Sequence, residues 1–149
     1  MVVLVHHADA VDPLIDPQRP LSDVGRAQAA SVANALLARG VKPECIWHSG
    51  KLRARQTAEA IRRTCNPLAE FAAIRGLLPD DPPEWIRDRL TTESRTVALV
   101  GHLPHLKRVV HTLLGTTEEW KADFPLHGAI ALEEVDEGWV ERWRLTVTT

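Results

Sequence analysis

Residues 96–104 read Thr-Val-Ala-Leu-Val-Gly-His-Leu-Pro and hold the clearest buried strand of the chain. The apolar run over residues 96–100 does not alternate with polar residues, which is typical of a strand buried on both faces in a largely parallel sheet. The following Gly101-His102-Leu103-Pro104 predicts a turn into a helix that extends to about Gly115, because proline is favoured in a first helical turn. His102 is therefore expected at the carboxyl edge of the sheet.

A second run of the same kind opens the chain. Val2-Val3-Leu4-Val5 predicts another buried strand, and His6 and His7 follow it directly. In open α/β sheets, ligands bind beyond the carboxyl ends of the strands. We therefore expect His7 and His102 to meet in one pocket at this edge.

The rest of the chain alternates between strand and helix patterns. Helical spacing predicts a helix from the N-cap Ser22 to a stop at Gly40, and further helices over residues 52–63 and around residues 85–90. Strands are predicted at residues 45–48, within residues 68–74, at residues 129–132 and at residues 139–147, the last two forming an antiparallel hairpin through the turn at residues 136–138. This order predicts one domain over residues 1–149, a three-layer α/β/α sandwich with a mixed, mostly parallel sheet.

Composition narrows the class of protein. The chain has 149 residues, 44% of them hydrophobic, which is enough for one sizeable core. Its 18 basic and 20 acidic side chains give a formal net charge of -2, so neither nucleic acid nor a membrane surface is an expected partner. Two cysteines are too few for a disulfide framework, and the apolar N-terminal run stops after five residues. These features favour a cytoplasmic location.

Side chains that can take part in catalysis lie where predicted strands end in turns. His6 and His7 follow the first strand, Ser49 and Arg53 follow the second, and His102 follows the strand at residues 96–100. An imidazole nitrogen can attack phosphorus, and a guanidinium can bind the oxygens of the transferring group. The combination predicts phosphoryl transfer.

These segments resemble, in the same order, those of the histidine phosphatase superfamily, which includes the phosphoglycerate mutases. The first strand of that family ends in Arg-His-Gly or Arg-His-Ala, where this chain has His6-His7-Ala8. Further matching segments are Arg19-Pro20-Leu21-Ser22 with Gly25 and Gln28-Ala29, residues 49–57 (Ser-Gly-Lys-Leu-Arg-Ala-Arg-Gln-Thr), Gly101-His102-Leu103-Pro104 and residues 128–132. The short span between Thr64 and Thr96 leaves little room for inserted segments, which favours the compact branch of SixA-type phosphohistidine phosphatases.

The resemblance implies a phosphoglycerate mutase-like fold and a mechanism in which His7 takes the phosphoryl group as a phosphohistidine. It assigns catalytic roles to His7, His102 and Arg53, and phosphate binding to His6, Arg53, His102, Arg19 and Ser49. Candidate proton donors are Asp80, Asp81 and Glu84 on a proline-rich loop. No metal or other cofactor is expected, and the implied substrate is a phosphohistidine on a protein or a small phosphorylated metabolite.

One departure from the family leaves an alternative open. His6 stands where the family has arginine, and histidine is shorter and only partly protonated near neutral pH. Phosphate binding should weaken, and activity should be slow, shifted to acid pH or absent. The alternative function is a degenerate, non-catalytic phosphate-binding member of the same superfamily.

Other interpretations concern single residues. The imidazoles of His6, His7, His102 and His105 also allow a zinc site, although no HExxH or paired-cysteine pattern accompanies them and zinc would compete with the nucleophilic role of His7. Asp9 either orients a pocket histidine or caps the following turn. Trp85 and Trp120 are candidates for the rim of the pocket, and Arg55 is interpreted as a solvent-facing arginine.

Overall fold

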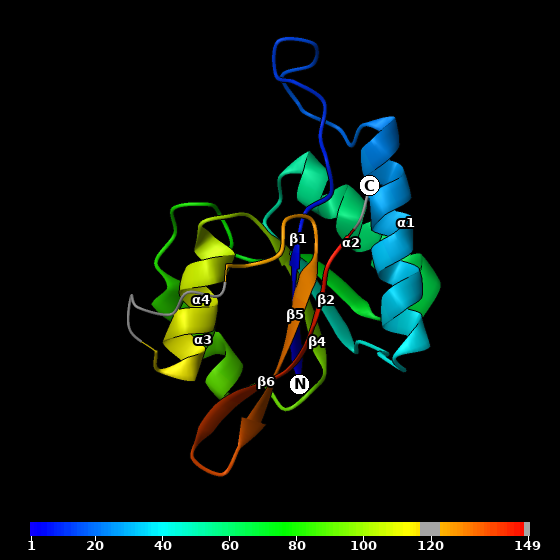
Figure 1. Cartoon of the computed structure of the whole chain (residues 1–149). Coiled ribbons are helices and arrows are strands. Elements are labelled where there is room, and N and C mark those ends of the chain that lie inside the picture. The colour runs from blue at the N-terminus through cyan, green and yellow to red at the C-terminus, as the bar shows by residue number, and fades with distance from the viewer. Residues whose placement is uncertain (117–122, 148–149) are drawn as a thin grey trace.

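The computed structural model describes residues 1–116 and 123–147, and these form three layers. A six-stranded sheet of order β3-β2-β4-β1-β5-β6 lies between α1 and α2 on one face and α3 and α4 on the other (Figure 1). The strands are β1 (Val2–His6), β2 (Cys45–His48), β3 (Glu70–Ala73), β4 (Val97–Gly101), β5 (Ala129–Val135) and β6 (Gly138–Leu145). The helices are α1 (Asp23–Ala38), α2 (Leu52–Cys65), α3 (Pro83–Thr91) and α4 (His105–Leu114). The predicted α/β sandwich is confirmed.

The strand pairing explains the mixed sheet. β1 pairs in parallel with β4, β4 with β2, and β2 with β3, whereas β5 runs antiparallel to both β1 and β6. The start of β5 therefore lies at the same edge as the ends of β1 and β4. At that edge the N–H of His6 donates to the carbonyl of Gly128 at 3.0 Å.

The central strands supply both halves of the core. In β1, Val2 and Leu4 pack in the cluster on the side of α3 and α4, and Val3 and Val5 pack in the cluster on the side of α1 and α2. All four are at most 1% exposed. Each such burial contributes about 1.5–3 kcal/mol, which explains why the run shows no polar alternation.

The first helix holds the loop that follows β1. Ser22 caps α1 as predicted, because its Oγ accepts the N–H of Gly25 at 3.0 Å. A Cβ at Gly25 would lie 1.9 Å from the carbonyl oxygen of Asp9, so only glycine allows this close approach. Gly40, in the left-handed conformation at φ 73°, follows the end of the helix.

The turn at Gly101–Pro104 leads into α4 as predicted, and the helix ends at the C-cap Gly115. The proline lies one place earlier than the first turn that the sequence predicts, because Pro104 is the N-cap and its carbonyl accepts the N–H of Arg108. His102 therefore lies in the turn before α4 and not on the helix. Proline suits this place because the N-cap needs no helical N–H donor. No helix within residues 1–116 and 123–147 is long and apolar enough to span a bilayer.

Candidate active site

His7 lies just past the end of β1, where its backbone N–H donates to the carbonyl of Gly101 at 3.1 Å. Its ring Nδ1 lies 2.7 Å from the carbonyl oxygen of Ala8. A carbonyl only accepts, so Nδ1 carries the proton and Nε2 carries the lone pair. Burial, with a smaller effect of the Arg53 charge, lowers the pKa of His7 to about 4 against the opposing effect of the Ala8 hydrogen bond. The ring is therefore neutral at pH 7, with Nε2 free to act as a nucleophile.

His102 lies beside His7, as predicted, with the ring centroids 5.1 Å apart. Its Nε2 lies 2.6 Å from the Ser49 hydroxyl, while its buried Nδ1 has no hydrogen-bond partner among the described residues. Burial lowers its pKa to about 3, with further lowering by His7 and Arg53. This ring is also neutral, and its Nε2 is engaged by Ser49.

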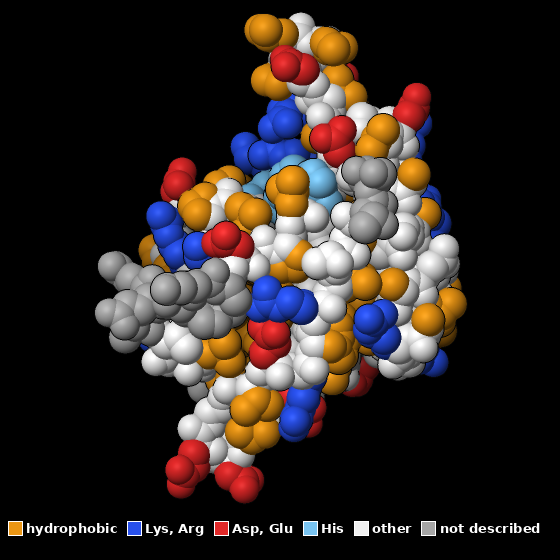
Figure 2. Space-filling view, viewed as in Figure 1, with side chains coloured by type: hydrophobic (Ala, Val, Ile, Leu, Met, Phe, Trp, Pro, Cys, Tyr) orange, Lys and Arg blue, Asp and Glu red, His pale blue; other side chains and the backbone are white. Residues whose placement is uncertain are grey.

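Two arginines bring positive charge to the site. The Nε of Arg53, in the first turn of α2, is buried without a partner among the described residues. Burial lowers the pKa of Arg53, and so does the charge of Arg19. Arg19 donates through Nε to the carbonyl of Val11 at 3.0 Å, and its charge also lowers the pKa of His7. Figure 2 shows a patch of Lys and Arg side chains directly beside the histidine surface.

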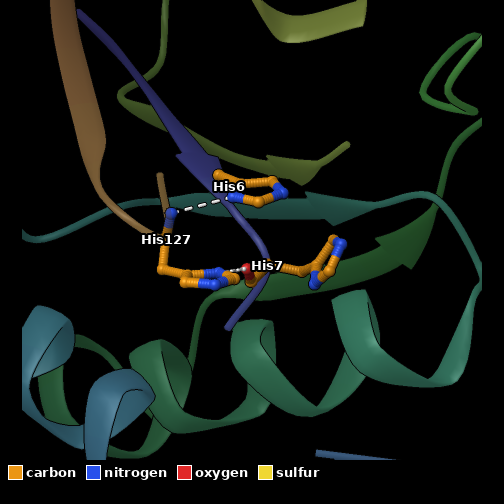
Figure 3. Close-up of side chains that lie close together, drawn as sticks. All are labelled: His6, His7 and His127. Carbon is orange, nitrogen blue, oxygen red and sulfur yellow. Dashed lines mark hydrogen bonds between the residues drawn. The ribbon is translucent and has the colours of Figure 1, made fainter. Parts of the chain in front are cut away.

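The side chain of His6 contacts His127, a residue that the sequence patterns did not identify. The backbone N–H of His127 donates to the His6 Nδ1 at 2.8 Å, and the two rings stack 4.9 Å apart at 10° (Figure 3). The His127 Nδ1 donates in turn to the carbonyl of His7 at 2.8 Å. His127 precedes β5, so its position could have been found by noting that an antiparallel strand starts at the edge where β1 ends.

His6 is a neutral group in this arrangement. Its Nδ1 accepts a hydrogen bond, so the ring proton is on Nε2. Burial lowers its pKa to about 2, helped by His7, His127 and the other nearby charges. His6 therefore replaces the charged fork of an arginine with a single neutral donor.

Three imidazoles come close enough to raise the question of a metal. One ring nitrogen from each of His6, His7 and His127 lies within 4.8 Å of the other two. With His6 protonated at Nε2, only His7 and His127 keep a lone pair in this hydrogen-bonding pattern. Two such nitrogens fall short of the three protein ligands usual in catalytic zinc sites. His105, which the zinc interpretation included, is fully buried at the start of α4.

A second set of contacts holds the His7 loop. The N–H of Ala8 donates to the Thr57 hydroxyl at 3.0 Å, and that hydroxyl donates to the Arg53 carbonyl at 2.8 Å. The Asp9 carboxylate accepts the Ser22 hydroxyl at 2.6 Å. Asp9 therefore joins the loop to the start of α1, and of its two interpretations the structural one agrees with this contact. His7 and Arg53 are thus positioned by one connected network.

Of the predicted proton donors, Asp80 and Asp81 lie on the loop before α3, whereas Glu84 lies in the first turn of α3 and not on the loop. Asp81 accepts the N–H of Leu78 at 3.0 Å and lines a hollow that also includes Ser49 and Trp85. The side chains of Asp80 and Glu84 are exposed and form no hydrogen bond with another described residue. Their role as proton donors stays a prediction. Trp120 lies outside the described residues, and Arg55 is exposed beside Glu59, as expected.

The sequence of the chain matches the histidine phosphatase superfamily (branch 1) over residues 13–77. That segment includes Arg19, Ser49 and Arg53, but neither His7 nor His102. No curated protein sequence matches the chain at a significant level.

Solved structures match over almost the whole length. The protein histidine phosphatase SixA in complex with tungstate superposes with a TM-score of 0.84 at 24% identity, covering 97% of this chain and 96% of that one. A candidate phosphohistidine phosphatase SixA from Agrobacterium tumefaciens gives a TM-score of 0.81 at 24% identity, covering 99% and 97%. Phosphoserine phosphatase from Entamoeba histolytica in complex with 3-phosphoglyceric acid gives 0.76 at 17% identity, covering 98% and 96%.

This is the histidine phosphatase fold. The predicted resemblance is therefore confirmed, by sequence over residues 13–77 and by fold over nearly the whole chain. Within that fold, the structure brings His6, His7, His102, Ser49 and Arg53 to one edge of the sheet.

Proposed function

We propose that the protein is a metal-independent phosphatase that acts through a phosphohistidine formed on His7. The observation that carries the proposal is the hydrogen bond from the His7 Nδ1 to the Ala8 carbonyl, which fixes the lone pair on Nε2. The lowered pKa of about 4 keeps this nitrogen unprotonated at neutral pH. An imidazole in this form is a nucleophile for phosphorus.

The proposed reaction has two displacements. In the first, the His7 Nε2 forms a bond to phosphorus while the bond from phosphorus to the leaving nitrogen or oxygen breaks. In the second, a water oxygen bonds to phosphorus, the N–P bond breaks, and the water proton is released as inorganic phosphate leaves. A protonated phosphohistidine substrate already has a good leaving group, so it needs no strong acid from the protein.

The groups around His7 suit the charge that develops. Arg53 supplies a permanent cation, and the His102 ring lies 5.1 Å from the His7 ring. For His102 to bind an oxygen of the phosphoryl group, the Ser49 hydroxyl must turn from its Nε2 or bind the same anion. Preorganised donors of this kind stabilise the transition state for phosphoryl transfer.

The surface beside the site favours a phosphohistidine on a protein over a small metabolite. The loop that carries Arg19 projects from the body of the molecule (Figure 1), and its Leu14 and Ile15 are 95% and 80% exposed. Apolar side chains displayed beside a binding site are typical of protein contacts. Among the structural neighbours, SixA is a protein histidine phosphatase, which is consistent with this choice.

The test is phosphate release from a phosphohistidine peptide and from an aryl phosphate between pH 5 and 8. We expect turnover in the wild type, a higher kcat/KM for the peptide, and loss of turnover in His7→Ala. His111→Ala, which removes an imidazole bonded to Thr116 in another part of the chain, serves as the matched control. Equal phosphate release by wild type and His7→Ala would contradict the proposal.

A specific observation keeps a second function in view. His6 is neutral and its Nδ1 is already bonded to His127, so this position lacks the charge of an arginine. A chain with Arg53 and neutral rings alone could bind phosphate without useful turnover. Phosphate binding together with no turnover in the wild type would favour this non-catalytic function.

A further inference from the structure

His127 lies in one cluster with His6 and His7. Its ring lies 6.2 Å from the His7 ring and stacks on His6, and one nitrogen from each of the three rings lies within 4.8 Å of the others (Figure 3). A phosphoryl group bonded to one of these nitrogens would have its oxygens within hydrogen-bond reach of the next. His127 is also held in the left-handed conformation, at φ 56°.

The protonation pattern of this ring determines what it can do. The His127 Nδ1 donates to the His7 carbonyl, so in the neutral ring Nε2 carries a lone pair. That Nε2 has no hydrogen-bond partner among the described residues. A lone pair facing an anion is repelled, whereas a proton on Nε2 would turn the contact into a charge-assisted hydrogen bond.

We propose that His127 is a ligand of the transferring phosphoryl group and binds it as an imidazolium, so that anion binding takes up a proton at this ring. This inference rests on the proposed function for the anion at the site. Its chemistry concerns binding alone, so it can hold or fail independently of turnover.

Several other charged and titratable groups lie in the site with His127. They are His6 at the end of β1, His7 just after it, His102 after β4, Arg53 from α2 and Arg19 from the loop before α1. A proton on the His6 Nδ1 would break its bond from the His127 N–H. In His102, Nε2 is bonded to Ser49 and Nδ1 is buried. A proton on the His127 Nε2 breaks no hydrogen bond among the described residues.

His7 is the one competitor with the same form, because its Nε2 also carries a lone pair. In a complex with an unreactive anion, His7 can take up a proton as well. The decisive quantity is therefore the difference in proton uptake between the wild type and a variant without the His127 imidazole. Asparagine is the best replacement, since it tolerates the left-handed backbone and cannot take up a proton.

The experiment measures sulfate binding by calorimetry between pH 6 and 8, in buffers of different ionisation enthalpy. Sulfate remains a dianion over this range and is not hydrolysed by a phosphatase. We expect His127→Asn to take up about one proton fewer per sulfate than the wild type. As the pH rises, the sulfate affinity of the variant should also fall less steeply than that of the wild type, by up to about tenfold per pH unit. The control His111→Asn should match the wild type.

Three outcomes would overturn the inference: equal proton uptake by wild type and His127→Asn, no proton uptake by the wild type, or no sulfate binding. Nitrogen NMR of the wild-type rings keeps the question decidable if the variant does not fold. The inference requires both His127 nitrogens to be protonated in the sulfate complex, and a neutral His127 ring there would overturn it. Phosphate release that depends on His7 is measured in a separate experiment, and its result does not affect the sulfate-binding test.

Discussion

The two sides of the candidate site differ in how they provide charge. On the side of the parallel strands, α2 contributes Arg53, whose charge is permanent, and Ser49 holds His102. On the side where antiparallel β5 begins, the paired groups are His6 and His127, and His6 is neutral. The first side resembles a conventional phosphate site, while the second holds no permanent charge. Activity should therefore depend on both an arginine and pH.

The largest effect should come from removing the permanent charge. Arg53→Ala is expected to lower kcat/KM about a hundred- to a thousandfold, because an electrostatic contact to the developing charge is lost. The matched control is Arg55→Ala, on the same helix but exposed beside Glu59. Comparable losses of kcat/KM in the two variants would show that Arg53 contributes only to the overall electrostatic potential and does not contact the transferring group.

The second prediction restores a permanent charge to the other side. His6→Arg should raise kcat/KM about ten- to a hundredfold at pH 8, since a hydrogen bond to a charged group contributes about 1.5–3 kcal/mol. His6→Gln, which is neutral, is the control. An equal gain in His6→Gln would show that the charge at position 6 is not the cause.

A third predicted effect is on stability in acid. The pKa values of His6, His102 and His7 are lowered to about 2, 3 and 4 from an ordinary value of 6.5. Between pH 6.5 and 4 the unfolded chain takes up protons on these rings that the folded chain excludes, so the free energy of unfolding falls as pH falls. Each ring contributes up to about 1.4 kcal/mol per pH unit in this window.

Urea unfolding at several pH values tests this effect. His6→Asn should reduce the slope of the unfolding free energy against pH by about one such increment, because asparagine can accept the His127 N–H without titrating. His111→Asn is the control. An unchanged slope in His6→Asn would show that His6 is not held neutral in the folded protein.

Much of the fold and part of the site could be predicted from local patterns. Buried runs without polar alternation located β1 and β4, and the parallel pairing of such strands implied that His7 and His102 would meet. The Ser22 cap was also readable, because it depends on residues within one helical turn. The start of α4 is shifted by one residue because proline is acceptable both within a first turn and just before it.

The contacts on the antiparallel side could not be predicted in the same way. His127 is separated from His6 by 121 positions, and it reaches the site only because β5 pairs antiparallel with β1. The proton position on His6 depends on this partner and not on any local motif. The departure from arginine was visible in the sequence, but the group that it contacts was not.

The account is tested most directly by trapping the intermediate. The wild type is mixed briefly with a phosphohistidine peptide that carries labelled phosphate, quenched in base, and the labelled residue is located by mass spectrometry. A covalent phosphohistidine on His7, absent from His7→Ala and retained in His111→Ala, is the predicted result. Two results would contradict the central role of His7. One is the release of labelled phosphate by the wild type without any label on His7, and the other is a label on another histidine.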